Sequence, residues 1–411
     1  MGIVQSYKKT PLLTKLLVAM VVGAIFGAIF GEKILVVKPF GTVFLNLLKM
    51  AALPLIIVNL IAGISSLNDP KILGRVGVKI MLYYALTTTG AIIIGLVTGF
   101  LFKPGAGFVF EQAYSGTIEK IPSFGDTIIG LLPSNIFAAL TSGRFDQIVV
   151  FSAFMGIAIL FLKPADKEPL TKAFNSLANL FNKMIGIIMI YAPIGIAALM
   201  ACTVGKYGKM LAGFLAKYLG ASYVAIILQI ALYMLLLVVF TKTNPIRFLR
   251  KSSPLMITAL GTSSSLACVP ISLNCSDDMG IPRSISSFTI PLGSQINKDG
   301  NGIMLAITFL FAAQAINIPL SAGVLIKAIF IALILTTGAG GVPGGGIVTI
   351  AIIIDAFGLP LEVVGIIAGI FALIDMGFTT LNVLGDLVGT QIVAHSESKR
   401  DKRLANTAVK S

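Results

Sequence analysis

A lysine interrupts a part of the chain that is otherwise apolar enough to lie inside a membrane. Lys298 has the apolar residues 284–296 before it and the mainly apolar residues 302–326 after it. An unpaired charge at the centre of a bilayer costs about 2.5–3.5 kcal/mol on insertion scales, so an ionisable residue there is a candidate functional residue. The sequence Asn-Lys-Asp-Gly-Asn between the two runs predicts a helix that breaks near the middle of the membrane. Such breaks bind substrates and coupling ions in secondary transporters.

The composition agrees with a chain that crosses a membrane several times. Of the 411 residues, 56% are hydrophobic and 12% are charged. Residues 80–102, 185–205 and 218–241 carry no charge, and each run reaches the roughly 20 residues that a helix needs to cross a ~30 Å hydrocarbon core. The three cysteines and one histidine are too few for a disulfide framework or a His-rich metal centre, so we expect no cofactor. No cleavage pattern closes the first apolar run, which predicts a retained membrane helix rather than a signal peptide.

The net charge of +14 comes from short basic clusters between the predicted spans. These clusters fall in alternate connections between the spans and so share one side of the membrane, and the positive-inside rule then places both termini of this multi-pass cell-membrane protein in the cytoplasm. Lys206, Lys209 and Lys217 lie on the other side and weaken this pattern without reversing it. Solvated loops explain the clusters better than a nucleic-acid surface, so we expect no nucleic-acid partner. The clusters are Lys8, Lys9 and Lys15; Lys71, Arg75 and Lys79; Lys163, Lys167 and Lys172; Arg247, Arg250 and Lys251; and Lys399, Arg400, Lys402 and Arg403.

The apolar pattern predicts long spans in the first part of the chain and interrupted segments in the second. The long spans are expected near residues 12–30, 35–64, 78–103, 124–163, 170–204 and 212–242, with an external loop at residues 103–123. After residue 243 the apolar segments become shorter and richer in Ser, Gly, Asn and Asp.

Two of the later segments contain interruptions that suggest hairpins. Residues 261–265 read Gly-Thr-Ser-Ser-Ser, which indicates either serines bonded within one helix or the tip of a re-entrant hairpin. Residues 336–346 contain six glycines and Pro343, which predict a second hairpin; small-residue helix packing is the alternative, but it does not explain the proline. The second stretch lacks the Gly-Lys-Ser/Thr ending of a phosphate-binding loop, which argues against nucleotide binding.

The last apolar segment, residues 366–395, carries a polar stripe. Asp375 is followed by Thr379, Asn382 and Asp386 at intervals of four, seven and eleven residues, so all four side chains share one helical face. A polar face on an apolar helix points to a cavity or a partner and not to lipid. A structural network between helices is the alternative explanation.

A set of motifs extends along nearly the whole chain: Tyr83-Tyr84-x-x-Thr87-Thr88, Tyr191-Ala192-Pro193-Ile194-Gly195, Thr262-Ser263-Ser264-Ser265 with Pro270, Asn297-x-Asp299-Gly300, Gly341-Val342-Pro343-Gly344, and Asp375-Met376-Gly377 followed by Asn382-x-x-Gly385-Asp386. In order and spacing they resemble the dicarboxylate/amino acid:cation symporter family of glutamate and neutral amino acid transporters, in a prokaryotic form. The resemblance implies an all-α polytopic membrane protein with eight transmembrane helices plus two re-entrant helical hairpins. It also implies a homotrimer in the lipid bilayer, in which a mobile transport domain carries substrate by an elevator movement.

By the same resemblance, the chain divides into a static scaffold and a mobile transport domain. Residues 1–77 (helices 1 and 2) and 124–205 (helices 4 and 5) would form the scaffold. Residues 78–123 (helix 3 and an external loop) and 206–411 (helix 6, first hairpin, helix 7, second hairpin, helix 8 and a cytoplasmic tail) would form the transport domain.

The resemblance also implies which residues bind an amino acid. Asp375 is expected to bind the α-amino group and Asn382 the α-carboxylate, while backbone amides near Ser264 and in the Gly341–Gly344 tip close around the substrate. One carboxylate, one amide and exposed backbone N–H groups suit a zwitterion. The full expected set is Ser264, Ser265, Asn301, Val342, Pro343, Gly346, Asp375, Phe378, Thr379 and Asn382.

The sodium sites of the family map onto further polar positions. Carboxylate, amide and carbonyl oxygens are hard ligands of the kind that Na⁺ prefers. One site would use Tyr84, Thr87, Thr88, Asn297 and Asp299, a second would use Asn297, Asn382 and Asp386, and a third would use backbone carbonyls around Gln295, Thr336, Thr337 and Ala339.

One departure from the family concerns the substrate. Members that carry acidic substrates place an arginine three residues after the amine-binding aspartate and support it with an acidic residue one turn before that aspartate. Here those positions are Phe378 and Phe371, and Ser263 occupies the alternative arginine position in the first hairpin. An acidic substrate would lose its charge partner inside a low-dielectric pocket. We therefore expect a neutral L-amino acid with an apolar or bulky side chain.

The other departure is Lys298 itself, where sodium-coupled members usually carry methionine. An ammonium among Asp299, Asp375 and Asp386 would supply the positive charge that a bound Na⁺ supplies elsewhere, and a buried lysine can also exchange a proton. In the alternative, Lys298 forms a structural ion pair or reaches water, and sodium coupling persists. Asn301 replaces the usual threonine nearby. The residues thus leave three possibilities open: coupling to Na⁺, coupling to H⁺, or transport without a requirement for sodium.

The sequence therefore predicts a secondary active, cation-coupled transporter of a neutral amino acid. Ordinary sodium-coupled symport of acidic amino acids or C4-dicarboxylates is the alternative. An ion channel is more remote: re-entrant loops also build ion filters, but two unlike hairpins and a one-sided amino-acid site argue against one. No paired acid/base set, nucleophile elbow or soluble domain suggests an enzyme.

Overall fold

The computed structural model describes residue 10 and residues 12–65, 73–108, 132–142, 145–208, 210–338 and 344–408, and these residues are helical with no strand among them. The helices are α2 (Leu12–Phe30), the 3₁₀ helix η1 (Gly31–Val37), α3 (Lys38–Ser65), α4 (Leu73–Phe102), α6 (Ile136–Thr141), α7 (Phe145–Leu160), α8 (Pro164–Tyr207), α9 (Met210–Thr241), α10 (Pro245–Thr262), α11 (Ser265–Asp278), α12 (Arg283–Ile296), α13 (Asp299–Ala315), α14 (Ala322–Gly338), α15 (Gly345–Ala356) and α16 (Glu362–Ala408).

Five helical stretches in the described residues are long and apolar enough to cross a membrane. They are Thr14–Leu48, Arg75–Phe102, Pro164–Tyr207, Leu211–Thr241 and Glu362–Arg400. Shorter apolar helices occur at Val150–Leu160, Ala322–Gly338 and Gly345–Ala356. The expected number of eight membrane helices stays a prediction.

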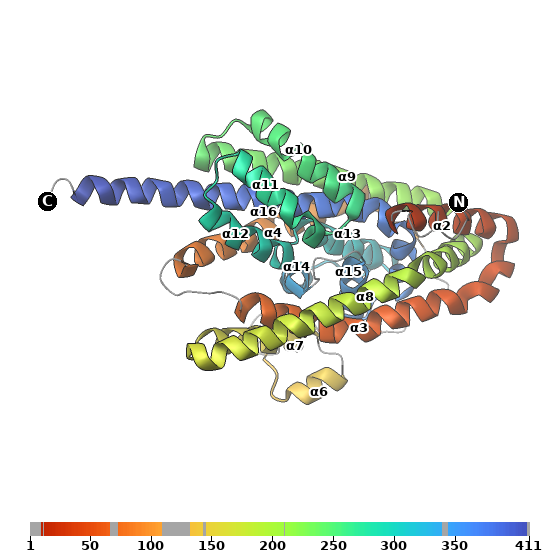
Figure 1. The fold of residues 1–411 in the computed structure, drawn as a ribbon. Coiled ribbons are helices and arrows are strands. Elements are labelled where there is room, and N and C mark those ends of the chain that lie inside the picture. Colours follow the sequence, from red (N-terminus) through yellow and green to blue (C-terminus); the bar gives the residue numbers. More distant parts are fainter. Residues whose placement is uncertain are drawn as a thin grey trace, which may run out of the picture.

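The helices form two packed groups (Figure 1). In the first group, α2 and α3 both pack along α8, and α7 packs on α3. Glycines allow these backbones to approach closely, because a Cβ at Gly23 or Gly27 of α2 would collide with a backbone oxygen of α8. In the second group, α4, α9, α13 and α16 pack around one another. A Cβ at Gly95 of α4 would lie 2.9 Å from the Ile303 carbonyl oxygen of α13, so this pair is equally close.

The serine-rich segment forms the tip of a helical hairpin rather than part of one continuous helix. Ser263 ends α10 in a left-handed conformation, with φ of +48°. The Ser264 side chain accepts a 3.3 Å hydrogen bond from the Ala267 N–H and so begins α11. The two helices pack against each other. The re-entrant position of this hairpin in a bilayer stays a prediction.

The glycine-rich segment separates a second pair of helices. α14 ends at Gly338, α15 begins at Gly345, and the two pack against each other. Residues 339–343 lie outside the described residues, so the expected roles of Ala339, Val342 and Pro343 stay predictions.

The single span predicted at residues 124–163 is wrong where the structure describes it. Two helices, α6 and α7, occupy this region, and residues 124–131 and 143–144 are outside the described ranges. The Asn135 side chain accepts hydrogen bonds from the N–H groups of Phe137 and Ala138, at 2.9 and 3.2 Å, which starts a separate short helix. Apolar composition alone does not reveal this helix start.

Candidate functional site

The predicted helix break lies between α12 and α13. Asn297 is extended and Lys298 has φ of −136° and ψ of +55°, so neither residue continues the helix. The side chains of Asn297, Lys298 and Asp299 are each at most 1% exposed. Three consecutive buried polar residues therefore occupy the break, and each one has a different set of neighbours.

The Asp299 carboxylate accepts three hydrogen bonds from uncharged donors. Thr88 of α4 donates to Oδ1 at 2.5 Å. From α9, Gln229 and Tyr233 donate to Oδ2 at 3.0 and 2.6 Å. Thr88 was expected from the sequence, whereas Gln229 and Tyr233 were missed. Polar residues in the middle of the predicted span 212–242 were the available signal for both.

The polar stripe of α16 meets the same break. The Asn297 side-chain amide donates to Asp386 Oδ1 at 3.0 Å and to the Asn382 carbonyl oxygen at 3.4 Å. The backbone N–H of Gly300 donates to Asn382 Oδ1 at 2.8 Å. Both Asn382 and Asp386 thus face protein and not lipid, as the sequence predicts, and they bind α16 to the α12–α13 junction.

The Lys298 ammonium turns back along α12. Its Nζ donates a 2.5 Å hydrogen bond to the Ser294 carbonyl oxygen. Asp386 and Asp375 act on the ammonium electrostatically, but no ion pair within 4 Å joins it to a carboxylate in the described part of the chain. The ammonium therefore neither reaches water nor forms a short ion pair with these residues.

The residues around the helix break include three carboxyl groups, Asp299, Asp375 and Asp386, and one amine, Lys298. Asp386 and Asp375 act on the ammonium, whereas Asp299 accepts hydrogen bonds from uncharged donors. The Asn297 Oδ1 and Gln229 Oε1 atoms are buried, and neither has a hydrogen-bond partner among the described residues. An unpaired buried acceptor costs about 1–3 kcal/mol, which coordination of a cation would offset. The carboxyl groups and the unpaired oxygens form a donor set that fits a hard monovalent cation.

The other expected cation positions differ in how close they lie to this cluster. A Cβ at Gly293 would collide with both the Tyr84 hydroxyl and the Asp386 carboxylate, so those two groups are neighbours. The Thr87 hydroxyl donates instead to the Tyr83 carbonyl oxygen of its own helix, at 3.1 Å. Gln295 has a buried Oε1 without a partner in the described part of the chain, and the hydroxyls of Thr336 and Thr337 donate to carbonyl oxygens of α14 at 2.7 Å. The role of these three residues in a cation site stays a prediction.

Asp375 is the member of the expected substrate set that lines a small cavity of about 20 Å³. Residues from the α10–α11 tip, the start of α15 and α16 surround it, and α2 closes one side. The cavity has room for about one water molecule, so entry of an amino acid requires these elements to move apart. The lining residues are Leu12, Leu16, Thr262, Ser263, Gly344, Phe371, Ala372 and Asp375. Ser264 and Ser265 adjoin Ser263, Thr379 lies 3.5 Å from Asp375, and Asn301 is buried in the first turn of α13.

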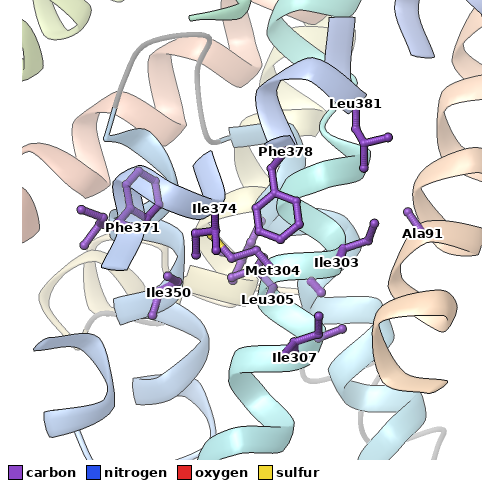
Figure 2. Close-up of a cluster of buried hydrophobic side chains, with 14 of the residues drawn as sticks. Ala91, Ile303, Met304, Leu305, Ile307, Ile350, Phe371, Ile374, Phe378 and Leu381 are labelled. Atoms are coloured by element: carbon purple, nitrogen blue, oxygen red, sulfur yellow. The ribbon is translucent and has the colours of Figure 1, made fainter. Parts of the chain in front are cut away.

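Phe371 and Phe378 are 1% and 0% exposed. A Cβ at Gly346 would lie 2.9 Å from the Phe371 ring and 3.0 Å from Met304, and a Cβ at Gly300 would lie 2.6 Å from the Phe378 side chain. Figure 2 shows both rings in one apolar cluster with Met304, a residue of α13. The two positions that would hold a charge pair for an acidic substrate are therefore packed as hydrophobic core.

Comparison with known proteins identifies the family. The profile of the sodium:dicarboxylate symporter family matches residues 12–396. The chain belongs to the sodium:dicarboxylate symporter family. It is an all-α membrane protein with a glutamate-transporter-like fold, and the members of this family are transporters and not enzymes.

Relatives in this family differ in the substrates that their names give. The proton/glutamate-aspartate symporter of Escherichia coli K12 is 32% identical over 90% of this chain and 87% of its own length. The C4-dicarboxylate transport protein of Bacillus subtilis 168 is 31% identical, over 91% and 90%. The neutral amino acid transporter B(0) of Oryctolagus cuniculus is also 31% identical, over 88% and 74%. Because these identities are nearly equal, overall sequence similarity does not indicate which substrate this chain binds. The substrate has to be inferred from the residues of the site.

Proposed function

We propose that this protein takes up a neutral L-amino acid with an apolar or bulky side chain, coupled to a cation. The observation that carries the proposal is the burial of Phe371 and Phe378 at the positions of the charge pair. Phe371 lines the small cavity, Phe378 packs on Gly300, and neither position offers a substrate a positive charge. Asp375 at the small cavity supplies the carboxylate for the substrate's ammonium.

The names of the Escherichia coli and Bacillus subtilis relatives favour acidic amino acids or C4-dicarboxylates as the alternative. That alternative requires a cation for the second carboxylate. The buried cation described near the site is Lys298, whose Nζ donates to Ser294 and lies under the influence of Asp386 and Asp375. An acidic substrate would have to compete with those two carboxylates for the ammonium, which favours the neutral substrate.

Lys298 also supports a particular form of coupling. A zwitterionic substrate adds no net charge, so it does not itself take the place of a coupling cation. We infer that the Lys298 ammonium replaces one coupling cation and that a further cation, Na⁺ or H⁺, binds near Asp386. The unpaired oxygen of Asn297, beside Asp386, supports the view that a cation still binds.

The two packed groups of helices support the division into a scaffold and a transport domain. The helices α2, α3, α7 and α8 correspond to the proposed scaffold, residues 1–77 and 124–205, except that α8 ends two residues later. The helices α4, α9 and α10–α16 correspond to the proposed transport domain, residues 78–123 and 206–411, except that α4 begins five residues earlier. An elevator movement of the second group against the first, re-entrant hairpins, a homotrimer and cytoplasmic termini belong to this proposal.

Binding to the purified protein tests the substrate. Isothermal titration calorimetry would compare leucine, phenylalanine and serine with aspartate, glutamate and succinate. The proposal expects a neutral amino acid to bind most tightly, and tighter binding of aspartate or succinate would overturn it. Uptake into proteoliposomes with separate sodium and pH gradients would then identify the coupling ion.

A further inference from the structure

A groove between α4, α9 and α16 shares no lining residue with the small substrate cavity, although Thr87 of its wall belongs to an expected cation site. It encloses about 740 Å³. Its walls are apolar, and its rim at one end is basic and polar. The wall residues are Leu82, Tyr83, Leu86, Thr87, Leu236, Phe240, Ile392 and Val393, and the rim residues are Lys79, His395, Ser396, Lys399 and Arg400.

The groove faces the surroundings of the protein rather than its interior. Leu82 and Leu86 on α4 are 58% and 64% exposed, and Phe240 on α9 is 55% exposed. These helices are apolar enough to span a membrane, so their exposed leucines and phenylalanine contact lipid chains. The rim lies where two of the apolar stretches end: Lys79 is four residues after the start of Arg75–Phe102, and Lys399 and Arg400 close Glu362–Arg400. The groove therefore runs from the acyl-chain region to the headgroup region.

The rim carries excess positive charge among the described side chains. Glu397 is 6% exposed and accepts hydrogen bonds from Arg75 and from Lys79, the latter at 2.7 Å. These bonds hold Lys79 at the rim and join α4 to α16. Lys399 and Arg400 are exposed and also line the rim, so the basic side chains there outnumber this one carboxylate.

We propose that this groove is a binding site for an anionic phospholipid. The headgroup phosphate binds Lys79, Lys399 and Arg400, and an acyl chain lies along Leu82, Leu86 and Phe240. Basic clusters at the end of a membrane helix attract anionic headgroups, and the apolar wall explains why the ligand is a lipid and not a soluble anion. A lipid bound here contacts α4, α9 and α16 together, so it stabilises the packing of these helices.

Native mass spectrometry of the purified protein, titrated with phosphatidylglycerol or phosphatidylcholine of identical acyl chains, tests the proposal. The wild type is expected to bind phosphatidylglycerol more tightly. Lys399→Gln with Arg400→Gln should weaken that binding about 25-fold, because each basic residue near an anionic surface contributes a factor of about five. Lys163→Gln with Lys172→Gln, at two exposed positions of the α8 start, is the matched control and should bind like the wild type.

A second pair of variants tests the apolar wall. Leu86→Trp fills the groove and should weaken binding of both lipids, whereas Leu101→Trp, on the same helix but outside the groove, should not. Equal binding of the two lipids by the wild type would overturn the proposal. So would equal losses in test and control variants, or displacement of phosphatidylglycerol by inorganic phosphate alone at a similar concentration.

Discussion

The Lys298 ammonium donates a 2.5 Å hydrogen bond to the carbonyl oxygen of Ser294, four residues earlier in the chain. This bond directs the ammonium back along α12, toward the side on which Asp386 and Asp375 act on it. The adjacent Asp299 carboxylate does not pair with this ammonium. It accepts three hydrogen bonds from uncharged donors on α4 and α9. One helix break thus buries two opposite charges without pairing them with each other, which leaves the ammonium available to the carboxylates of α16.

Asp375 is the first position to test. Asp375→Asn should weaken binding of every amino acid substrate by roughly 100- to 4,000-fold, because an ammonium buried without its partner loses about 3–5 kcal/mol. Calorimetry on the purified variant measures this loss. Asp355→Asn, at an exposed position of α15, is the control and should bind normally. Near-normal affinity in the Asp375 variant would mean that the amine-binding role is misassigned.

The second prediction restores the missing charge pair. Phe378→Arg combined with Phe371→Asp should improve binding of aspartate by about 10- to 100-fold, since hydrogen bonds to charged groups contribute about 1.5–3 kcal/mol. The single Phe378→Arg variant should melt at a lower temperature than the double variant, because its buried guanidinium has no partner.

Phe378→Leu combined with Phe371→Leu is the matched control for the charge pair, since it alters both rings and adds no charge. Competition of aspartate against a labelled neutral amino acid gives the relative affinities. If the charged double variant binds aspartate no better than this apolar control, the two positions do not determine substrate charge.

The third prediction concerns the packing that supports the site. A Cβ at Gly300 would collide with the Phe378 backbone, so Gly300→Ala should destabilise the protein by about 1–3 kcal/mol and lower its melting temperature. It should also weaken substrate binding, because the Gly300 N–H holds the Asn382 side chain. Gly261→Ala, where an added methyl group meets nothing within 4 Å, is the control. Identical melting of the two variants would contradict the close contact between α13 and α16.

Much of the site could be predicted because its signals are local in the sequence. A charged residue between apolar runs predicted the break at Lys298, and the four-residue and seven-residue spacing predicted that Asn382 and Asp386 share a face. Gln229 and Tyr233 could not be assigned in the same way. They lie 70 and 66 residues from Asp299, and only the packing of α9 on α13 and α16 brings them to its carboxylate.

The fold shows the same limit. From the sequence, Ser263 and Ser264 were equally compatible with one continuous helix and with two helices. The left-handed backbone of Ser263 ends the first helix and so produces a hairpin. The span predicted at residues 124–163 was wrong because Asn135 caps a separate short helix inside an apolar region. Hydropathy reports which residues avoid water, and it does not report where a buried helix stops.

Substrate binding measured in sodium and in choline buffer, for the wild type and for Lys298→Met, tests the central claim most directly. If the ammonium replaces one coupling cation, wild-type affinity should depend on sodium less steeply than the affinity of the variant does. The variant, which has lost that charge near Asp386 and Asp375, should bind roughly 5–150-fold more tightly in sodium than in choline. A steep sodium dependence of the wild type that Lys298→Met leaves unchanged would contradict the claim and indicate an ordinary sodium symporter.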